Sequence, residues 1–461
     1  AYPAVMRTFA DSGANVAPWT GKGLAGGNGD GYSKSFSRAK VLNGVTAGSK
    51  LDFMFAGCAS LKDADLTNLT VNASTTSLYG SFYQSGVTGF FTGQAVTADT
   101  ATSIASGVRV STRFAPTYAN LSATNMLQSC ASLIEVNLSG VFNQNGINLS
   151  YAFADCPSLV RVTMSNVGNG TSANMTGMFR NAATASSAIS DANAKVTLSS
   201  VGNADGAASS HGLDKNSNFT PNSQNTSLQG MFDGSAGIKA VTLTDVAKGK
   251  YANAYQMFRN CTALYSIAAT RFVNGNDAIA MYAFLNAGSN NNVPANSIAR
   301  ISLNDVATKG AAILQMFNNT LSSSNINQAD SVVEWLASRG TTDTGYSWNN
   351  QAVSLNSDFL LSGNKAQTMN MTGMPIIGNR VFGNLVSGSS ARYIFNNGTF
   401  YHVRQQVESN FTSLGKGYLT LPYRCRWYVS TIEFLCANNN NLQDAVWDKV
   451  FWRGNPSGND N

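Results

Sequence analysis

A 26-residue repeat runs through most of this chain and limits its fold more than any single residue does. In the clearest copy, Phe153 is followed at fixed offsets by Cys156, Leu159, Val162, Met164 and Val167, and eight further stretches fit the same template. Positions 127 and 153, 153 and 179, 232 and 258, and 258 and 284 are each 26 residues apart. A copy this short cannot enclose a hydrophobic core alone, so neighbouring copies must stack and share one. We therefore expect a solenoid.

Two different spacings alternate within each copy. The Phe-x-x-Cys-x-x-Leu part places its apolar residues three apart, which predicts a short helical turn. The Val-x-Leu part alternates with period two, which predicts a short strand. The predicted fold class is therefore an α/β repeat. Two copies, from Phe179 to Val196 and from Phe284 to Ile301, carry eight extra residues, which we expect to form loops on the same side.

The repeat divides the chain into three expected parts. Residues 1–50 do not fit the repeat and are predicted to be an N-terminal attachment or capping segment. Residues 51–327 hold the array, and residues 328–461 are predicted to form a capping helix followed by a β-rich C-terminal domain. The stretch 329–337 is amphipathic and begins near Asp330, which suits the positive end of a helix. Runs such as 417–421 and 426–430 favour strands.

The core of the repeat resembles a known family. The resemblance is carried by Met54-Phe55-Ala56-Gly57-Cys58-Ala59-Ser60-Leu61, Ala152-Phe153-Ala154-Asp155-Cys156-Pro157-Ser158-Leu159 and Met257-Phe258-Arg259-Asn260-Cys261-Thr262-Ala263-Leu264. These segments are similar to leucine-rich repeats of the BspA-like type, including a related bacterial family built on Met-Phe-x-x-Cys-x-x-Leu. The similarity covers a little over half of the chain. It implies a leucine-rich-repeat solenoid and a role typical of the family, as a surface adhesion or host-contact protein or a phage structural protein.

The cysteines follow the repeat. Four of the six occupy one slot, three residues after the aromatic position, where other copies hold Ala182 and Ser235: they are Cys58, Cys130, Cys156 and Cys261. A slot that accepts Cys, Ala or Ser calls for a small buried side chain. We therefore expect free, packed thiols in the array. Cys425 and Cys436 lie outside it, and the sequence leaves open whether they are bridged.

Composition narrows the partners and the location. Charged residues make up 12% of the chain, about half of the usual quarter. A neutral surface rich in Asn, Ser, Thr and Gly is typical of extracellular proteins and virus fibres. The net charge of +6 is spread thinly, without the basic run that nucleic-acid binding needs. No stretch of eighteen apolar residues is present, so membrane insertion is not expected.

Signals for an enzyme are few, and no cofactor or metal site is predicted. The chain has two histidines, His211 and His402, too few for a zinc cluster or a Ser-His-Asp arrangement with any redundancy. Gly21, Gly23 and Gly26 match a dinucleotide motif, but no buried strand precedes them and no helix follows. A polysaccharide-degrading enzyme with two paired acids stays open as an alternative, because aspartates are available.

The outer face of the strands is the first candidate binding site. Inward Leu and Val positions leave the intervening residues facing solvent on one shared sheet. The predicted contact residues there are Glu135, Arg161, Lys195, Lys239, Tyr265 and Arg300. The alternative is a merely solvated face. Thr163, Thr197 and Thr242 also recur in one row, but one Thr per copy is too sparse to indicate ice binding.

Aromatic residues near the C-terminus are the second candidate site. Trp427, Tyr428, Trp447 and Trp452 are interleaved with arginines, a combination that stacks on sugars or fills a partner's pocket. The alternative is that these side chains form the core of the C-terminal domain.

The sequence thus favours a non-enzymatic recognition or adhesion protein. The expected setting is extracellular, on a virion or a bacterial cell, with a host-surface glycan or protein as the partner. Low charge, free array cysteines and the missing export signal favour the phage setting. A purely structural subunit of a fibre or shell, contacting its own copies or other virion subunits, is the second hypothesis, and the polysaccharide-degrading enzyme is the third.

Overall fold

The computed structural model describes residues 50–67, 69–70, 76–92, 107–111, 120–206, 224–275, 278–307, 311, 313, 315–327 and 330–336, together with the backbone of short strands elsewhere. The chain divides into two compact units. The first holds residues 1–208 and 223–237, and the second holds residues 209–222 and 238–461. Each unit is described by itself.

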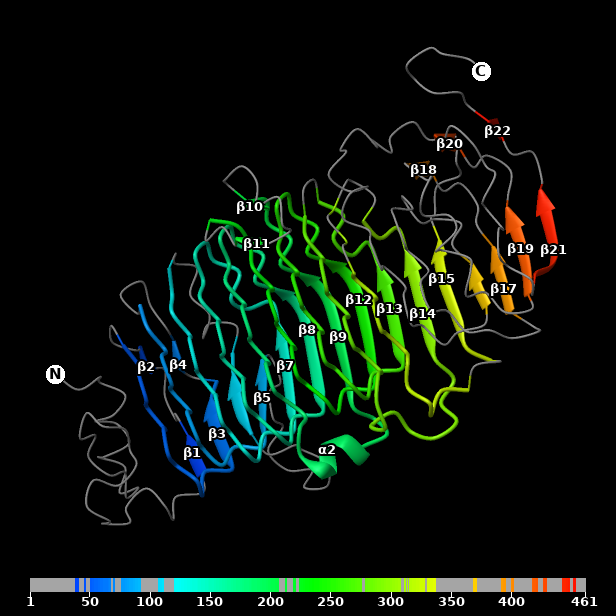
Figure 1. Cartoon of the computed structure of the whole chain (residues 1–461). Coiled ribbons are helices and arrows are strands. Elements are labelled where there is room, and N and C mark those ends of the chain that lie inside the picture. Colours follow the sequence, from blue (N-terminus) through cyan, green and yellow to red (C-terminus); the bar gives the residue numbers. More distant parts are fainter. Residues whose placement is uncertain are drawn as a thin grey trace. The chain divides into compact units, whose positions relative to one another are not determined.

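The first unit is built on a parallel sheet (Figure 1). Its strands lie in the order β1-β3-β6-β5-β7-β8-β9, so that β6 is inserted between two strands that precede it in the chain. A separate parallel pair joins β2 and β4. The bounds are β1 (Arg38–Lys40), β2 (Val45–Thr46), β3 (Asp63–Leu66), β4 (Leu69–Thr70), β5 (Gly89–Thr92), β6 (Val108–Val110), β7 (Glu135–Ser139), β8 (Arg161–Val167), α2 (Ser186–Ser190) and β9 (Lys195–Val201).

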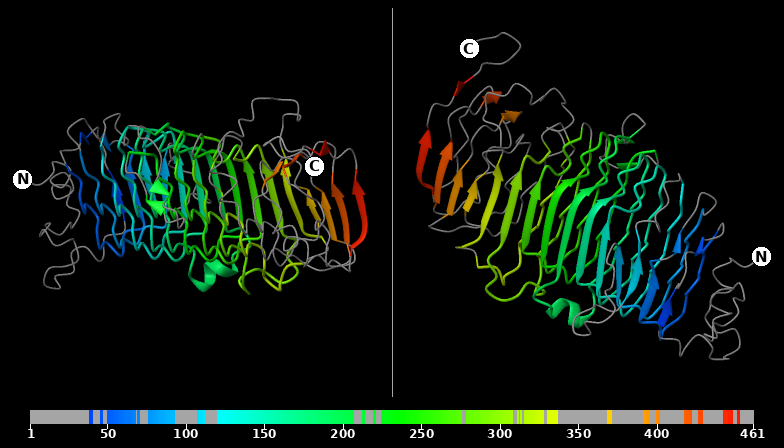
Figure 2. Two further views of the ribbon diagram at one scale, coloured as in Figure 1. Left: turned by 45° about the horizontal axis from the view of Figure 1, so that its top comes forward. Right: turned by 180° about the vertical axis from the view of Figure 1, so that it is seen from behind.

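The second unit also has a parallel sheet, in the order β12-β13-β14-β15-β16-β17-β19-β21. Figure 2 shows the strands of each unit from two further directions. A hairpin joins β10 and β11, and β18, β20 and β22 form a small parallel sheet. The bounds are β10 (Gly212–Leu213), β11 (Phe219–Thr220), β12 (Ala240–Val246), β13 (Ser266–Thr270), β14 (Arg300–Asn304), β15 (Val332–Leu336), β16 (Thr368–Asn370), β17 (Ala391–Ile394), β18 (Thr399–Tyr401), β19 (Gly417–Leu421), β20 (Arg426–Tyr428), β21 (Leu442–Trp447) and β22 (Phe451–Trp452).

The strands β7 to β9 and β12 to β15 each pair with their repeat counterpart without a slip. In the first unit the buried residues Val136, Val162 and Val196 are direct partners across β7, β8 and β9. In the second unit Ile267, Ile301 and Val333 match in the same way. Copies of one template therefore lie side by side, as predicted, and the architecture is compatible with a repeat solenoid.

The aromatic position of the repeat forms stacked columns opposite the sheet. In the first unit Phe179 stacks between Phe153 and Phe232, with ring centroids 5.1 and 4.9 Å away. In the second unit Phe284 stacks between Phe258 and Phe317, at 5.1 Å from each. These rings are fully buried. The core of each unit thus lies between a sheet and a column of rings.

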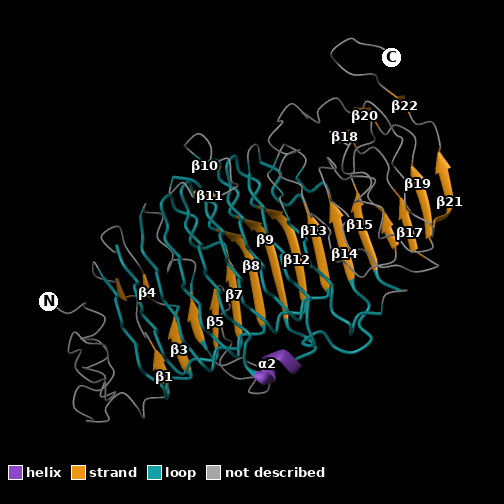
Figure 3. Cartoon of the chain, in the orientation of Figure 1, coloured by secondary structure: helices purple, strands orange, loops and turns teal. Residues whose placement is uncertain are grey.

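The predicted helical turns are wrong, because the Phe-x-x-Cys segments form tandem β-turns. Figure 3 shows them as loop, and α2 is the one helix in the described part of the chain. In the copy at 123–130, hydrogen bonds join residues three apart, and Asn125 and Ser129 have φ of 55° and 60°. A positive φ at the third residue of a hydrogen-bonded turn is the mark of type II. Such turns share the three-residue spacing of a helix, which explains the error.

Every second amide of a turn segment bonds to the next copy. In the copy at 123–130 the forward donors are Ala123, Asn125, Leu127 and Ser129, and their acceptors are the carbonyls of Asn148, Ser150, Ala152 and Ala154. The amides of Met126, Gln128 and Cys130 close the local turns. All the forward bonds point the same way along the array.

The predicted capping helix over 329–337 is also wrong, because this stretch holds strand β15. Exposure alternates along it, with Val333 and Trp335 buried and their neighbours partly exposed. The strand pairs in parallel with β14, and Trp335 packs against Phe317 at 6.2 Å. Two adjacent β-branched valines and a free strand edge outweigh the amphipathic helical pattern.

The cysteine slot is buried, as predicted, and all four array thiols are free. The slot also has a role that the sequence analysis missed: its side chain donates to the carbonyl of the aromatic position in the preceding copy. Cys130 Sγ donates to Phe82 at 3.0 Å, Ser235 Oγ to Phe179 at 2.8 Å and Thr320 Oγ1 to Phe284 at 2.6 Å. Where the slot holds Cys, Ser or Thr it therefore supplies a donor, whereas Ala182 fills the same space without one. Cys425 and Cys436 lie outside the described residues.

Removal of a ring from the column is expected to be costly. Phe179→Ala should lower the free energy of unfolding by about 3–5 kcal/mol, because it leaves a cavity between two stacked rings. Thr197→Ala, on the outer face of β9, should change it by less than about 0.5 kcal/mol. Chemical denaturation of both variants tests this, and equal losses would show that the column does not carry the core.

The buried thiols predict a loss of stability at high pH. Burial raises the pKa of Cys58 to about 12 and that of Cys130 to about 11. Because these values exceed the roughly 8.5 of an unfolded thiol, the stabilisation is complete below that pH and is lost as pH rises toward 11. Cys130→Ser, which keeps the donor, should therefore weaken the fall in unfolding free energy between about pH 9 and pH 11. Identical pH profiles for the variant and the original chain, measured under reducing conditions, would contradict this.

Candidate functional site

The outer face of the first unit's sheet carries three polar rows. Strand register aligns Glu135 with Arg161 and Lys195 in the first row. The second row is Asn137, Thr163 and Thr197, and the third is Ser139, Ser165 and Ser199. Adjacent strands are about 4.8 Å apart, so side chains of one row are immediate neighbours. The result is an ordered surface of small hydroxyl groups bordered by one charged row.

The charged row is partly neutralised within the unit. Arg161 Nε lies 3.2 Å from Glu135 Oε2, and a second guanidinium nitrogen of Arg161 lies 3.9 Å from Asp191 Oδ2. Asp191 follows α2 in the eight-residue insertion, so the insertion supplies a charge to the sheet face. Lys195 is exposed at the end of the row. This row therefore brings together three of the six predicted strand-face residues.

In the second unit the predicted row is only partly correct. The residues that share the outward row are Ala240, Ser266, Arg300 and Val332, of which Arg300 is exposed. Lys239 precedes the row by one residue and is 2% exposed, so its assignment to the solvent face is wrong. Tyr265 precedes the row in the same way and is half-buried. A shift of one residue turns a side chain to the other face of a sheet.

The C-terminal aromatics lie where the structure gives only the backbone. Trp427 and Tyr428 are in β20, Trp447 ends β21 and Trp452 ends β22. The strand assignments agree with the predicted β character of this region. The side chains of these four residues, together with Gly21, Gly23, Gly26, His211 and His402, lie outside the described part of the chain.

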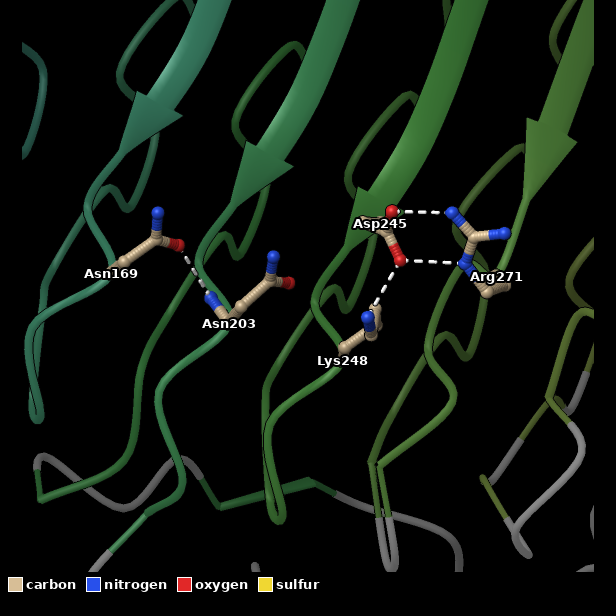
Figure 4. Close-up of polar contacts among 5 residues, drawn as sticks. All are labelled: Asn169, Asn203, Asp245, Lys248 and Arg271. Carbon is tan, nitrogen blue, oxygen red and sulfur yellow. Dashed lines mark hydrogen bonds and ion pairs between the residues drawn. The ribbon is translucent and has the colours of Figure 1, made fainter. Parts of the chain in front are cut away.

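A corner after each strand holds an interaction that the sequence analysis missed. Asn143 and Asn169 each lie two residues after a buried valine, Val141 or Val167. Each asparagine side chain forms hydrogen bonds with the backbone of the following copy. Asn169 Oδ1 accepts from the amide of Asn203 at 3.0 Å (Figure 4). Asn169 Nδ2 donates to the carbonyl of Ser200 at 2.8 Å. Asn143 makes the same two contacts to residues 169 and 166. The sequence signal for this contact is an asparagine two residues after a buried valine.

In the second unit a charged cluster occupies the corresponding corner. Asp245 accepts from Arg271 Nε at 2.7 Å, from a second Arg271 nitrogen at 2.5 Å and from Lys248 Nζ at 2.6 Å (Figure 4). The hydrogen bonds from Arg271, followed by those from Lys248, hold the pKa of Asp245 well below its ordinary value although partial burial opposes them. Asp245 in turn raises the pKa of Arg271. In the second unit this ion-paired cluster links adjacent copies, whereas in the first unit asparagine side-chain amides link them.

The described surfaces are polar and carry few charges. In the described part of the chain, no group of three or more His, Cys, Asp or Glu side chains is placed to hold a metal ion. No described helix has the length and hydropathy needed to cross a bilayer. The sheet face offers hydroxyl groups, amides and a few charges, which suit hydrogen bonding to a polar partner.

No protein-family model, curated protein or solved structure matches this chain.

The Asp245 cluster predicts how the pKa of its carboxylate changes when a neighbouring cation is removed. Arg271→Gln should raise the pKa of Asp245 toward about 3.9, because the largest stabiliser of its carboxylate is removed. Lys248→Gln should raise it less. The stabilisation by this pair is present above the ordinary pKa and is lost as pH falls. Since both cations are substantially exposed, it should amount to less than about 1 kcal/mol. Carboxyl-resolved NMR titration of the variants tests the order, and a larger shift in Lys248→Gln would reverse it.

Proposed function

We propose that this chain is a non-enzymatic recognition or adhesion protein with a leucine-rich-repeat-type solenoid and a β-rich C-terminal domain, displayed on a virion or a bacterial surface. The observation that carries the proposal is the in-register outer face of the first unit's sheet. It presents rows of small polar side chains at a constant spacing, with Glu135, Arg161 and Lys195 along one border. Repeat proteins commonly use such extended faces for binding.

The low content of charged residues in this chain favours a receptor that carries few charges. Charged residues are 12% of the chain, and Arg161 is paired with Glu135 and Asp191. A host-surface glycan or a polar protein patch fits this face better than a polyanion, which needs many cations. The phage setting is favoured by the same low charge together with reduced, buried array cysteines.

The two alternative functions, a structural subunit and a polysaccharide-degrading enzyme, require different features of the chain. A purely structural subunit of a fibre or shell would also have a neutral, regular surface, and it would contact copies of itself or other virion subunits. A polysaccharide-degrading enzyme needs an acid whose pKa is raised. The recognition proposal ranks first because it rests on the in-register polar rows of the first unit's sheet.

Binding by the purified chain tests the proposal. We expect saturable binding to cells of a host strain or to a glycan array, weakened about three- to tenfold in Lys195→Ala and in Arg161→Ala, as for polar interface contacts. Ser187→Ala, exposed on α2 away from the strand rows, is the matched control. Trp427→Ala tests the second predicted site in the same assay. Absence of binding, combined with an assembly that persists on dilution, would point to the structural subunit.

A further inference from the structure

The first unit has a second outward surface, on the side of the tandem turns. We call it the turn face and define it by the outward residues of segments 50–57, 77–84, 122–129, 148–155 and 174–181. Isolated parallel bridges link the successive segments at Lys50, Ser77, Ser122, Asn148 and Asn174. The turn face is therefore as regular as the sheet. The sequence analysis assigned it no role.

Two aromatic residues on the turn face adopt a backbone conformation that bulky side chains avoid. Phe53 has φ of 53° and Tyr151 has φ of 55°. The same position of the repeat holds Gly80 and Gly177 in the next copies, and glycine is the residue suited to positive φ. The conformation belongs to the turn template, because Asn125 has φ of 55° at the same position. Two copies of the first unit therefore hold an aromatic side chain where the turn requires positive φ.

Each of these rings lies over the glycine of the following copy. A Cβ at Gly80 would come within 2.8 Å of the Phe53 ring, and one at Gly177 within 2.5 Å of the Tyr151 ring. The rings therefore lie along the array, on a backbone that has no side chain at that point. Both aromatic residues are only partly buried, so part of each remains accessible. The same aromatic-on-glycine arrangement occurs twice in one unit.

Tyr79 completes the set and is held from several sides. Its ring packs edge-on against Phe53, with centroids 5.1 Å apart, and its side chain is among the few large apolar ones that are exposed, at 36%. Asn125 Nδ2 donates to Tyr79 Oη at 3.2 Å. The Tyr79 amide donates to Asp52 Oδ1 at 3.0 Å, and its carbonyl accepts from the Phe53 amide at 2.8 Å. An exposed ring fixed in this way is ordered before any ligand arrives.

The surroundings of these rings are neutral and rich in hydroxyl groups. Ser122, Thr124 and Ser150 form a connected row, with oxygen atoms 3.2 and 3.4 Å apart. The segment that holds Phe53 carries one cation, Lys50, and one anion, Asp52, whose carboxylate accepts from Ser77 and from the Tyr79 amide. These opposite charges leave no excess of cations beside the rings to favour an anionic ligand. A ligand with apolar patches and many hydroxyl groups matches both the rings and the row.

We propose that the turn face of the first unit binds a neutral glycan, with Tyr79 and Phe53 as stacking platforms and Asn125 and Thr124 as hydrogen-bonding partners. The inference rests on the proposed recognition function and assigns it a ligand class and a second surface. Pyranose rings have apolar faces that stack on aromatic side chains and hydroxyl groups that pair with amides and hydroxyls. A protein partner is the competing occupant, and the test separates the two.

The test measures binding of the full chain to an array of neutral and acidic oligosaccharides, followed by titration with the best neutral ligand. Tyr79→Ala should raise its dissociation constant at least about tenfold, the cost of losing a stacked anchor. Tyr79→Phe keeps the ring and should stay within about threefold, which is less than the cost of a full hot spot. Ser187→Ala, exposed on α2, is the matched control and should bind as the original chain does. Lys195→Ala is measured beside it to report on the sheet face. Circular dichroism verifies that the variants remain folded.

Other outcomes are equally definite. Binding to acidic glycans alone, or to no glycan while cells are still bound, overturns this inference and leaves the recognition proposal standing, with a protein receptor as the partner. Loss of neutral-glycan binding in Lys195→Ala but not in Tyr79→Ala places the ligand on the sheet face and also overturns it. Failure to bind both cells and glycans rejects the recognition proposal and this inference together.

Discussion

The parallel register between neighbouring copies is the constraint on which the rest of the structure depends. Strands pair without a slip, and every second amide of a turn segment bonds forward to the next copy. Because both walls of each unit are tied in the same register, residues of one template position come to lie in rows and columns. The phenylalanine columns, the cysteine slot and the polar rows are all consequences of this single alignment.

Because the copies are regularly spaced, different side chains can make equivalent contacts in different copies. The corner after the strand is clamped by asparagine amides in the first unit and by the Asp245 and Arg271 ion pair in the second. The buried slot uses a thiol in some copies and a hydroxyl in others, and both donate to the same carbonyl. The slot also accepts Ala182, which has no donor, so the size of the side chain limits substitution there more strictly than its chemistry does.

The sequence predicted the features that follow from periodicity. The period, the stacked rings, the aligned strands and the free thiols all depend on which residues recur, and recurrence is visible in the letters. The two helical predictions failed because three-residue spacing belongs equally to tandem type II turns, and because residues 329–337 meet an open strand edge that only the folded neighbour supplies. Lys239 was misplaced because it lies two residues before Val241 and so shares the buried face of that strand.

The surfaces were harder to read than the core. The Asn clamp has a sequence signal, an asparagine two residues after a buried valine, but its function requires the position of the next copy's backbone. Phe53 and Tyr151 were missed for another reason: they occupy the positive-φ position of the turn, which bulky residue types disfavour. Backbone exceptions of this kind are invisible to propensity and appear only in coordinates.

One consequence of the forward hydrogen bonds concerns electrical direction. In the copy at 123–130 four N–H groups face the later copy, whereas single amides such as those of Asn148 and Asn174 donate back to the earlier copy, at Leu121 and Ile147. The forward N–H dipoles therefore outnumber the backward ones along the turn segments and leave a net dipole in one direction, as along an α-helix. Copies can therefore follow one another in one orientation only, so the array has a defined direction.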